Sequence, residues 1–156
     1  MRSLLTPSLL AVLSIACAHP GGSTMPASTF SNPPGLAPPR GYTHVVDVPA
    51  GRMVYVAGQV AFDAKGNVVG PGDVRAQTEQ VFRNLKIALE SAGATFADVV
   101  KLNWYVRDAS QIAVYREVRE QFLGDGPRPA STLVEVKGLV RDDLLIEIEA
   151  VAAPRH

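Results

Sequence analysis

The chain has 156 residues, and its fifteen basic and fifteen acidic side chains give a formal net charge of zero. Hydrophobic residues make up 47% and charged residues 19%, which indicates one globular domain and excludes a disordered protein. A neutral chain lacks the basic excess of nucleic-acid-binding proteins, and the three scattered histidines and one cysteine form no metal-binding motif. We therefore expect no nucleic-acid partner, no metal and no cofactor.

The first 17 residues have the layout of an export signal. Arg2 is followed by an apolar stretch at 4–16, which is too short to span a bilayer, and then by Cys17, the only cysteine. This layout resembles a bacterial lipoprotein signal with a lipidated cysteine, although Ser14 stands where a leucine is usual. We predict an exported protein, periplasmic or membrane-anchored through a lipid on Cys17. The alternative is a cytoplasmic protein that starts at Met25.

Residues 18–40 are rich in proline, glycine and serine, which predicts a linker, with a single domain over 41–156. In the domain, β-branched and aromatic runs predict strands, and apolar side chains at helical spacing predict helices. Asp73 is suited to begin the first helix and Gly93 to end it. The predicted elements are strands at 42–49 and 53–62, a helix at 74–92, a strand at 99–106, a helix at 110–123, and strands at 131–136 and 144–152.

This β-β-α-β-α-β-β order predicts an α+β fold in which two helices cover one face of a single-layer mixed sheet. The last strand alternates between two sets of side chains, and the second set is half apolar. The two sets are Leu144, Ile146, Ile148 and Ala150, and Leu145, Glu147, Glu149 and Val151. Because such a face is unfavourable in water, we expect other subunits to cover it.

Four segments together resemble the Rid family, also called the YjgF family. They are AGQVAFDAKGNVVG, QTEQVFRNLKIALESAGATFADVVKLNWYVRD, PASTLVEV and LIEIEAVA, and the resemblance spans residues 33–153. It implies a chorismate-mutase-like α+β fold, a homotrimer, and small-molecule clefts between neighbouring subunits. The best-known activity of the family is hydrolysis of reactive enamines and imines, such as those that pyridoxal-phosphate enzymes release.

The resemblance also implies roles for individual residues. Tyr42 matches a cleft tyrosine, and Glu147 matches a glutamate that helps to place water or substrate. Deaminase members bind the substrate carboxylate through an arginine in a Pro-Ala-Arg-Ser motif, and Ser131 occupies that position here. A cleft asparagine on the second helix is also replaced, and Arg116 is the nearest residue by ungapped counting.

Other candidates for the cleft have equally ordinary structural roles. Ser131 and Thr132 are suited to donate hydrogen bonds to a neutral or weakly polar ligand, or else to satisfy backbone groups at the strand edge. Gly58 and Gln59 are expected to line the cleft, although Gly58 is also suited to close strand packing.

Arg128 lies between two prolines, which hold it on a stiff, extended stretch of chain. Three residues of extended chain span about 10 Å, so Arg128 is not expected to replace the arginine missing at position 131 of its own chain. We interpret it as a rigid loop cation at a cleft rim or a subunit contact. Whether Arg128 or Arg116 of a neighbouring subunit enters the cleft stays an open question.

Three functions therefore stay open from the sequence. The first is a hydrolase acting on small reactive nitrogen or carbonyl metabolites, with Glu147 orienting water. The second is a trimer that binds small molecules without catalysis because it lacks the arginine clamp. The third is RNA cleavage, another activity of the family, which a neutral chain without a basic stripe favours least.

Overall fold

The computed structural model describes residues 27–49 and 51–155. The predicted export signal, Cys17 and the alternative start at Met25 lie outside the described residues. In the part of the chain that is described, no helix has the length and apolar character needed to cross a membrane.

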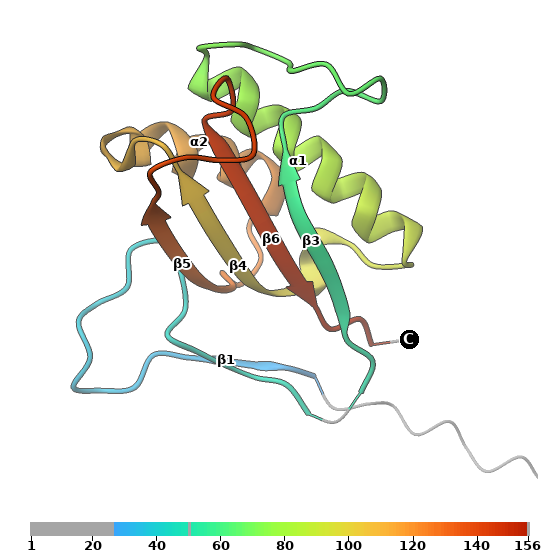
Figure 1. Cartoon of the computed structure of the whole chain (residues 1–156). Helices are drawn as coiled ribbons and strands as arrows, with labels where there is room; N and C mark the ends of the chain where they lie inside the picture. Colours follow the sequence, from blue (N-terminus) through green and yellow to red (C-terminus); the bar gives the residue numbers. More distant parts are fainter. Residues whose placement is uncertain (1–26, 50, 156) are drawn as a thin grey trace, which may run out of the picture.

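The centre of the domain is a four-stranded mixed sheet with two helices on one face (Figure 1). Its strands run in the order β3-β6-β4-β5; β4 and β5 are parallel, and the other neighbours are antiparallel. The bounds are β3 Val54–Val60, α1 Val74–Ser91, β4 Val99–Val106, α2 Ile112–Leu123, β5 Ala130–Glu135 and β6 Ile146–Ala152, with short 3₁₀ helices at Phe96–Asp98 and Ala109–Gln111. This arrangement confirms the predicted α+β class with both helices on one side.

The first predicted strand is not part of that sheet. Its ordered portion, β2 (Val45–Asp47), pairs in antiparallel register with β1 (Thr29–Ser31) to form a separate two-stranded sheet. β1 lies within the stretch predicted as a linker. The sequence pattern identified a strand near Val45, but it carried no information about the strand's partner, and the prediction of one five-stranded sheet was wrong.

The first helix, α1, begins and ends where the sequence predicted. The side chain of Asp73 accepts a hydrogen bond from the backbone N–H of Ala76 at 3.0 Å, which satisfies one of the free donors of the first turn. Gly93 follows the helix at a φ of +65°, a conformation that other residues rarely adopt. The inward face of α1 carries Val81, Leu85 and Leu89, all fully buried.

Aromatic side chains join the two helices to the sheet. The ring of Phe82 on α1 lies 5.6 Å from Trp104 on β4 and 5.1 Å from Phe122 on α2, measured between centroids. This packing leaves Trp104 only 3% exposed and fixes its position between β4 and α2.

The opposite face of the sheet carries no helix, and it is the face turned toward the viewer in Figure 1. On β6 the side chains of Ile146 and Ile148 are buried against the helices, whereas Glu147 and Glu149 are half-buried on the other face, as the alternation predicted. Tyr55 on β3 is 77% exposed. We refer to this side of the sheet as the open sheet face.

Candidate functional site

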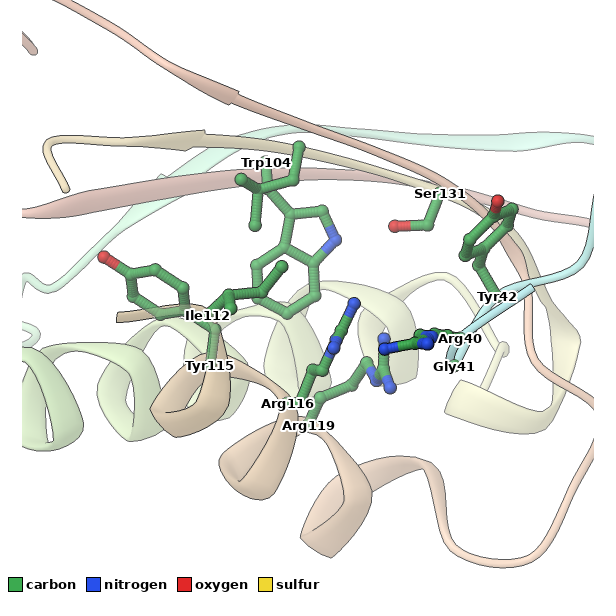
Figure 2. A pocket seen from close by; sticks show the side chains of 10 residues that line it. Arg40, Gly41, Tyr42, Trp104, Ile112, Tyr115, Arg116, Arg119 and Ser131 are labelled. Carbon is green, nitrogen blue, oxygen red and sulfur yellow. The ribbon is translucent and has the colours of Figure 1, made fainter. Parts of the chain in front are cut away.

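A cavity of about 160 Å³ lies between α2, the strands β4 and β5, and the loop that leads to β2 (Figure 2). It opens on the helix side of the sheet. Its lining combines aromatic and aliphatic walls with three guanidinium groups: Arg40, Gly41, Tyr42, Trp104, Ile112, Tyr115, Arg116, Arg119, Ser131 and Leu133.

The loop that closes one side of the cavity is held by hydrogen bonds. The backbone N–H of Thr43 donates to the carbonyl of Pro129 at 3.2 Å, which ties the loop to the start of β5. The ring nitrogen Nε2 of His44 lies 2.8 Å from the carbonyl oxygen of Ala37. Gly41 adopts a φ of +79°, and a side chain there would overlap the guanidinium of Arg119. The cavity wall therefore depends on a glycine at position 41.

Two nearby arginines share one carboxylate, Glu120. Arg119 is 6% exposed and donates to Oε1 of Glu120 from Nε at 3.0 Å and from Nη2 at 2.6 Å. Arg128 binds the other oxygen of Glu120 and also donates to the carbonyl of Gly126 at 2.7 Å. Burial would raise the pKa of Glu120, but its bonds to Arg119 and Arg128 lower that pKa, so Glu120 stays charged.

Arg128 does not line the cavity, and its guanidinium is tied to α2. This contact agrees with its interpretation as a rigid loop cation. It also gives Arg128 a structural role, since the residue links the loop before β5 to the helix.

Arg116 and Arg40 are different, because no carboxylate within 27–49 and 51–155 lies at ion-pair distance from either one. Arg116 is half-buried on α2, and its guanidinium extends into the cavity toward Trp104 and Ser131 (Figure 2). The lining contains no acidic residue. The cavity is therefore electropositive and suited to an anion.

Tyr115 contributes to the cavity wall as a neutral phenol. Its hydroxyl donates to the backbone carbonyl of Asp108 at 3.0 Å. Burial, followed by the negative charges of Asp108 and Glu135, raises the pKa of Tyr115 to about 12. Tyr115 therefore stays protonated at neutral pH, and its hydrogen bond to Asp108 holds its ring in the cavity wall.

Other predicted site residues lie on the open sheet face. Glu147 pairs with Val60 on β3 and packs over Gly58, where a side chain would overlap its Oε1 atom. By contrast, Gln59 lies opposite Ile148 in the register of β3 and β6, and its amide donates to the carbonyl of Ala57 at 3.1 Å. Thr132 is exposed, and its hydroxyl accepts a hydrogen bond from Nζ of Lys101 at 2.7 Å.

The environment of Glu147 favours its protonated form. Burial first, and then the charge of Glu149, raise the pKa of Glu147 above its ordinary value. Glu149 is held by Asn103 and by the hydroxyl of Tyr105, each donating to its Oε2 atom at 3.2 Å. Burial and the charge of Glu149 also raise the pKa of Tyr105. Glu147 therefore keeps its proton to a higher pH than an ordinary surface glutamate does.

The structure divides the predicted site residues into two groups on opposite faces of the sheet. Tyr42 and Ser131 line the cavity, whereas Gly58, Glu147 and Thr132 lie on the open sheet face. The sequence interpretation missed Trp104, Arg40 and Arg119 as cavity residues. One signal was available, because Arg116 and Arg119 are spaced i, i+3 and so share one face of α2.

A family model described as Endoribonuclease L-PSP matches residues 34–154, which is most of the chain. The chain belongs to this family, the Rid family. A solved Rid-family protein from Yersinia pestis, YyfB, is 40% identical to this chain and has a TM-score of 0.76, covering 81% of this chain and 98% of that one. The resemblance noted in the sequence is thereby confirmed.

Two curated proteins illustrate the relatives of this Rid protein. A RutC family protein of Pyrococcus horikoshii is 40% identical over 67% of this chain and 82% of its own length. A 2-iminobutanoate/2-iminopropanoate deaminase of Dermatophagoides farinae is 31% identical over 81% of this chain and 95% of its own length.

Proposed function

We propose that this Rid protein forms a homotrimer with small-molecule clefts between its subunits, and that it hydrolyses small reactive imines or enamines there. One observation carries the proposal: the cavity and the Glu147 group lie on opposite faces of one subunit's sheet. A second copy that covers the open sheet face is able to bring its own cavity against Glu147. The deaminase among the relatives supports the reaction class.

The reaction is the addition of water to a C=N bond. Glu147 takes a proton from the water as the water oxygen bonds to the imine carbon, and returns that proton to the imine nitrogen as the C=N double bond becomes single. Glu147 then transfers the hydroxyl proton of the carbinolamine to its amino group, so that the C–N bond breaks, ammonia leaves and a carbonyl compound remains. The raised pKa of Glu147 suits a carboxylate that accepts and returns a proton near neutral pH.

The test is hydrolysis of 2-iminobutanoate, generated in place by an amino-acid oxidase and followed through trapping of residual imine with semicarbazide. We expect the protein to accelerate the loss of imine in proportion to its concentration. Glu147→Gln is expected to lower the rate by roughly 100-fold or more, the usual contribution of a general acid–base group. Glu90→Gln, an exposed acid on α1, is the matched control and should keep the rate. Imine loss at the uncatalysed rate with the intact protein would refute the proposal.

Ser131 favours a second candidate, a trimer that binds small acids without turnover, since it stands where deaminase members place the carboxylate-binding arginine. Saturable binding of 2-oxobutanoate with no acceleration of imine loss would select this candidate. The family description names an endoribonuclease, but the neutral chain offers little electrostatic attraction for a polyanion.

A further inference from the structure

The cavity contains one half-buried arginine, Arg116, that pairs with no acidic residue of the described chain. Arg119 is held by Glu120, and Arg128 binds the same carboxylate from outside the cavity. Arg40 is exposed on the loop at the rim. Arg116 projects from the middle of α2, is half-buried, and has no acidic partner among the described residues. A half-buried guanidinium without a counter-charge gains a charged hydrogen bond from an anionic ligand.

Trp104 supplies a second, independent sign of a ligand. The residue is 3% exposed, and Figure 2 shows its indole nitrogen turned toward Ser131 and the tip of Arg116. The described part of the chain has no side-chain nitrogen or oxygen that is fully buried and unpartnered. The indole N–H bonds to no protein acceptor there, so it keeps its access to the cavity. A donor this well fixed is suited to an acceptor oxygen brought by a ligand.

The remaining walls define the rest of the ligand. Ile112, Leu133 and the ring of Tyr115 add apolar surface to the lining. A cavity of about 160 Å³ is close to the size that holds benzene, about six non-hydrogen atoms. This volume fits an acid of three or four carbons, which has five or six non-hydrogen atoms.

From these features we infer that the carboxylate clamp of this protein lies on α2, at Arg116, and that the cavity takes a short-chain aliphatic carboxylate. Arg116 binds the carboxylate, the Trp104 N–H and the Ser131 hydroxyl donate to its oxygens, and the aliphatic chain lies against Ile112 and Leu133. This inference rests on the cleft of the proposed function and names the acid class that the cleft accepts.

The test is equilibrium binding to the full-length protein, measured by calorimetry at low salt, with butanoate and butanamide as the probes. The two ligands have nearly the same size and shape, but only butanoate is charged. We expect butanoate to bind at least tenfold more tightly than butanamide. Arg116→Gln should weaken butanoate binding by roughly 10- to 100-fold, the range for a lost charged hydrogen bond, and leave butanamide almost unchanged.

Two further variants distinguish direct carboxylate binding by Arg116 from a general effect of positive charge on butanoate affinity. Arg83→Gln removes a cation of α1 that is not part of the cavity lining, and its butanoate affinity should stay within twofold of the parent protein. Arg116→Lys keeps the charge but loses the planar fork, so an intermediate affinity is expected. Thermal unfolding of each variant verifies that the fold is retained.

The outcomes distinguish this inference from the proposed function. Butanoate binding that depends on Arg116, without imine hydrolysis, would support the clamp and refute catalysis. Imine hydrolysis with an unchanged KM in Arg116→Gln would support catalysis and overturn the clamp. Equal affinity for butanoate and butanamide, or equal losses in Arg116→Gln and Arg83→Gln, would also overturn it.

Discussion

Gly58 and Glu147 make one of the closest approaches on the open sheet face. A methyl group at position 58 would occupy the place of Glu147 Oε1, so Gly58→Ala must displace that carboxylate. The far end of a glutamate moves easily, and alanine also restricts the unfolded chain, so the free energy of unfolding should change by less than about 1 kcal/mol. Imine hydrolysis should fall toward the level of Glu147→Gln.

The matched control for that substitution is Gly126→Ala, because an added methyl group at Gly126 makes only an ordinary contact, 3.8 Å from the carbonyl oxygen of Leu123. Steady-state rates and urea unfolding of both variants are the measurements. Full activity in Gly58→Ala would show that the placement of the Glu147 carboxylate does not matter for the reaction.

The raised pKa of Glu147 also predicts a pH dependence of stability. The folded state retains the proton of Glu147 at pH values where the unfolded chain has lost it. The free energy of unfolding should therefore decrease as pH rises from about 4.5, the ordinary value, through the raised pKa of the folded state. Glu147→Gln removes this dependence, so its stability relative to the parent should improve across that window. Urea unfolding of both proteins between pH 4 and pH 7 measures the difference in their free energies of unfolding. The same pH dependence in the parent and in Glu147→Gln would contradict the raised pKa of Glu147.

Between α2 and β5, the chain is held by the contact of Arg128 with Glu120. The Glu120 side chain is 42% exposed, so solvent screening limits this ion pair to about 1 kcal/mol at most. Arg128→Ala should lower the free energy of unfolding by no more than that amount and leave butanoate affinity within twofold. A loss of affinity comparable to that of Arg116→Gln would show that Arg128 also serves the cavity.

The helices and strands could be predicted from local sequence patterns, whereas the arrangement of the site residues depended on contacts between distant parts of the chain. The alternation of Ile146 and Glu147 fixed the two faces of β6, and the capping side chain of Asp73 fixed the start of α1. The partner of β2 could not be predicted, since pairing depends on distant residues. Nor could the orientation of the Trp104 indole N–H, because rotamers follow from packing that one sequence does not display.

For the molecule as a whole, the open sheet face is the surface that a second copy should cover. It carries the exposed Tyr55 beside the half-buried Glu147 and Glu149. Tyr55→Asp places a charge on that face and should shift the proposed trimer toward smaller species. Ile87→Asp is the control, because Ile87 is 66% exposed on α1, on the other side of the sheet. Light scattering during gel filtration gives the mass of each variant. If Tyr55→Asp stays trimeric and Ile87→Asp dissociates, the interface lies on the helices instead.

The central claim is that the assembled protein hydrolyses small imino acids in a cleft that Glu147 completes. The most direct measurement is the initial rate of ammonia release from freshly generated 2-iminobutanoate, with the protein, with Glu147→Gln and without protein. The account predicts a rate proportional to protein concentration that falls roughly 100-fold or more in Glu147→Gln. The same rate in all three reactions would contradict it.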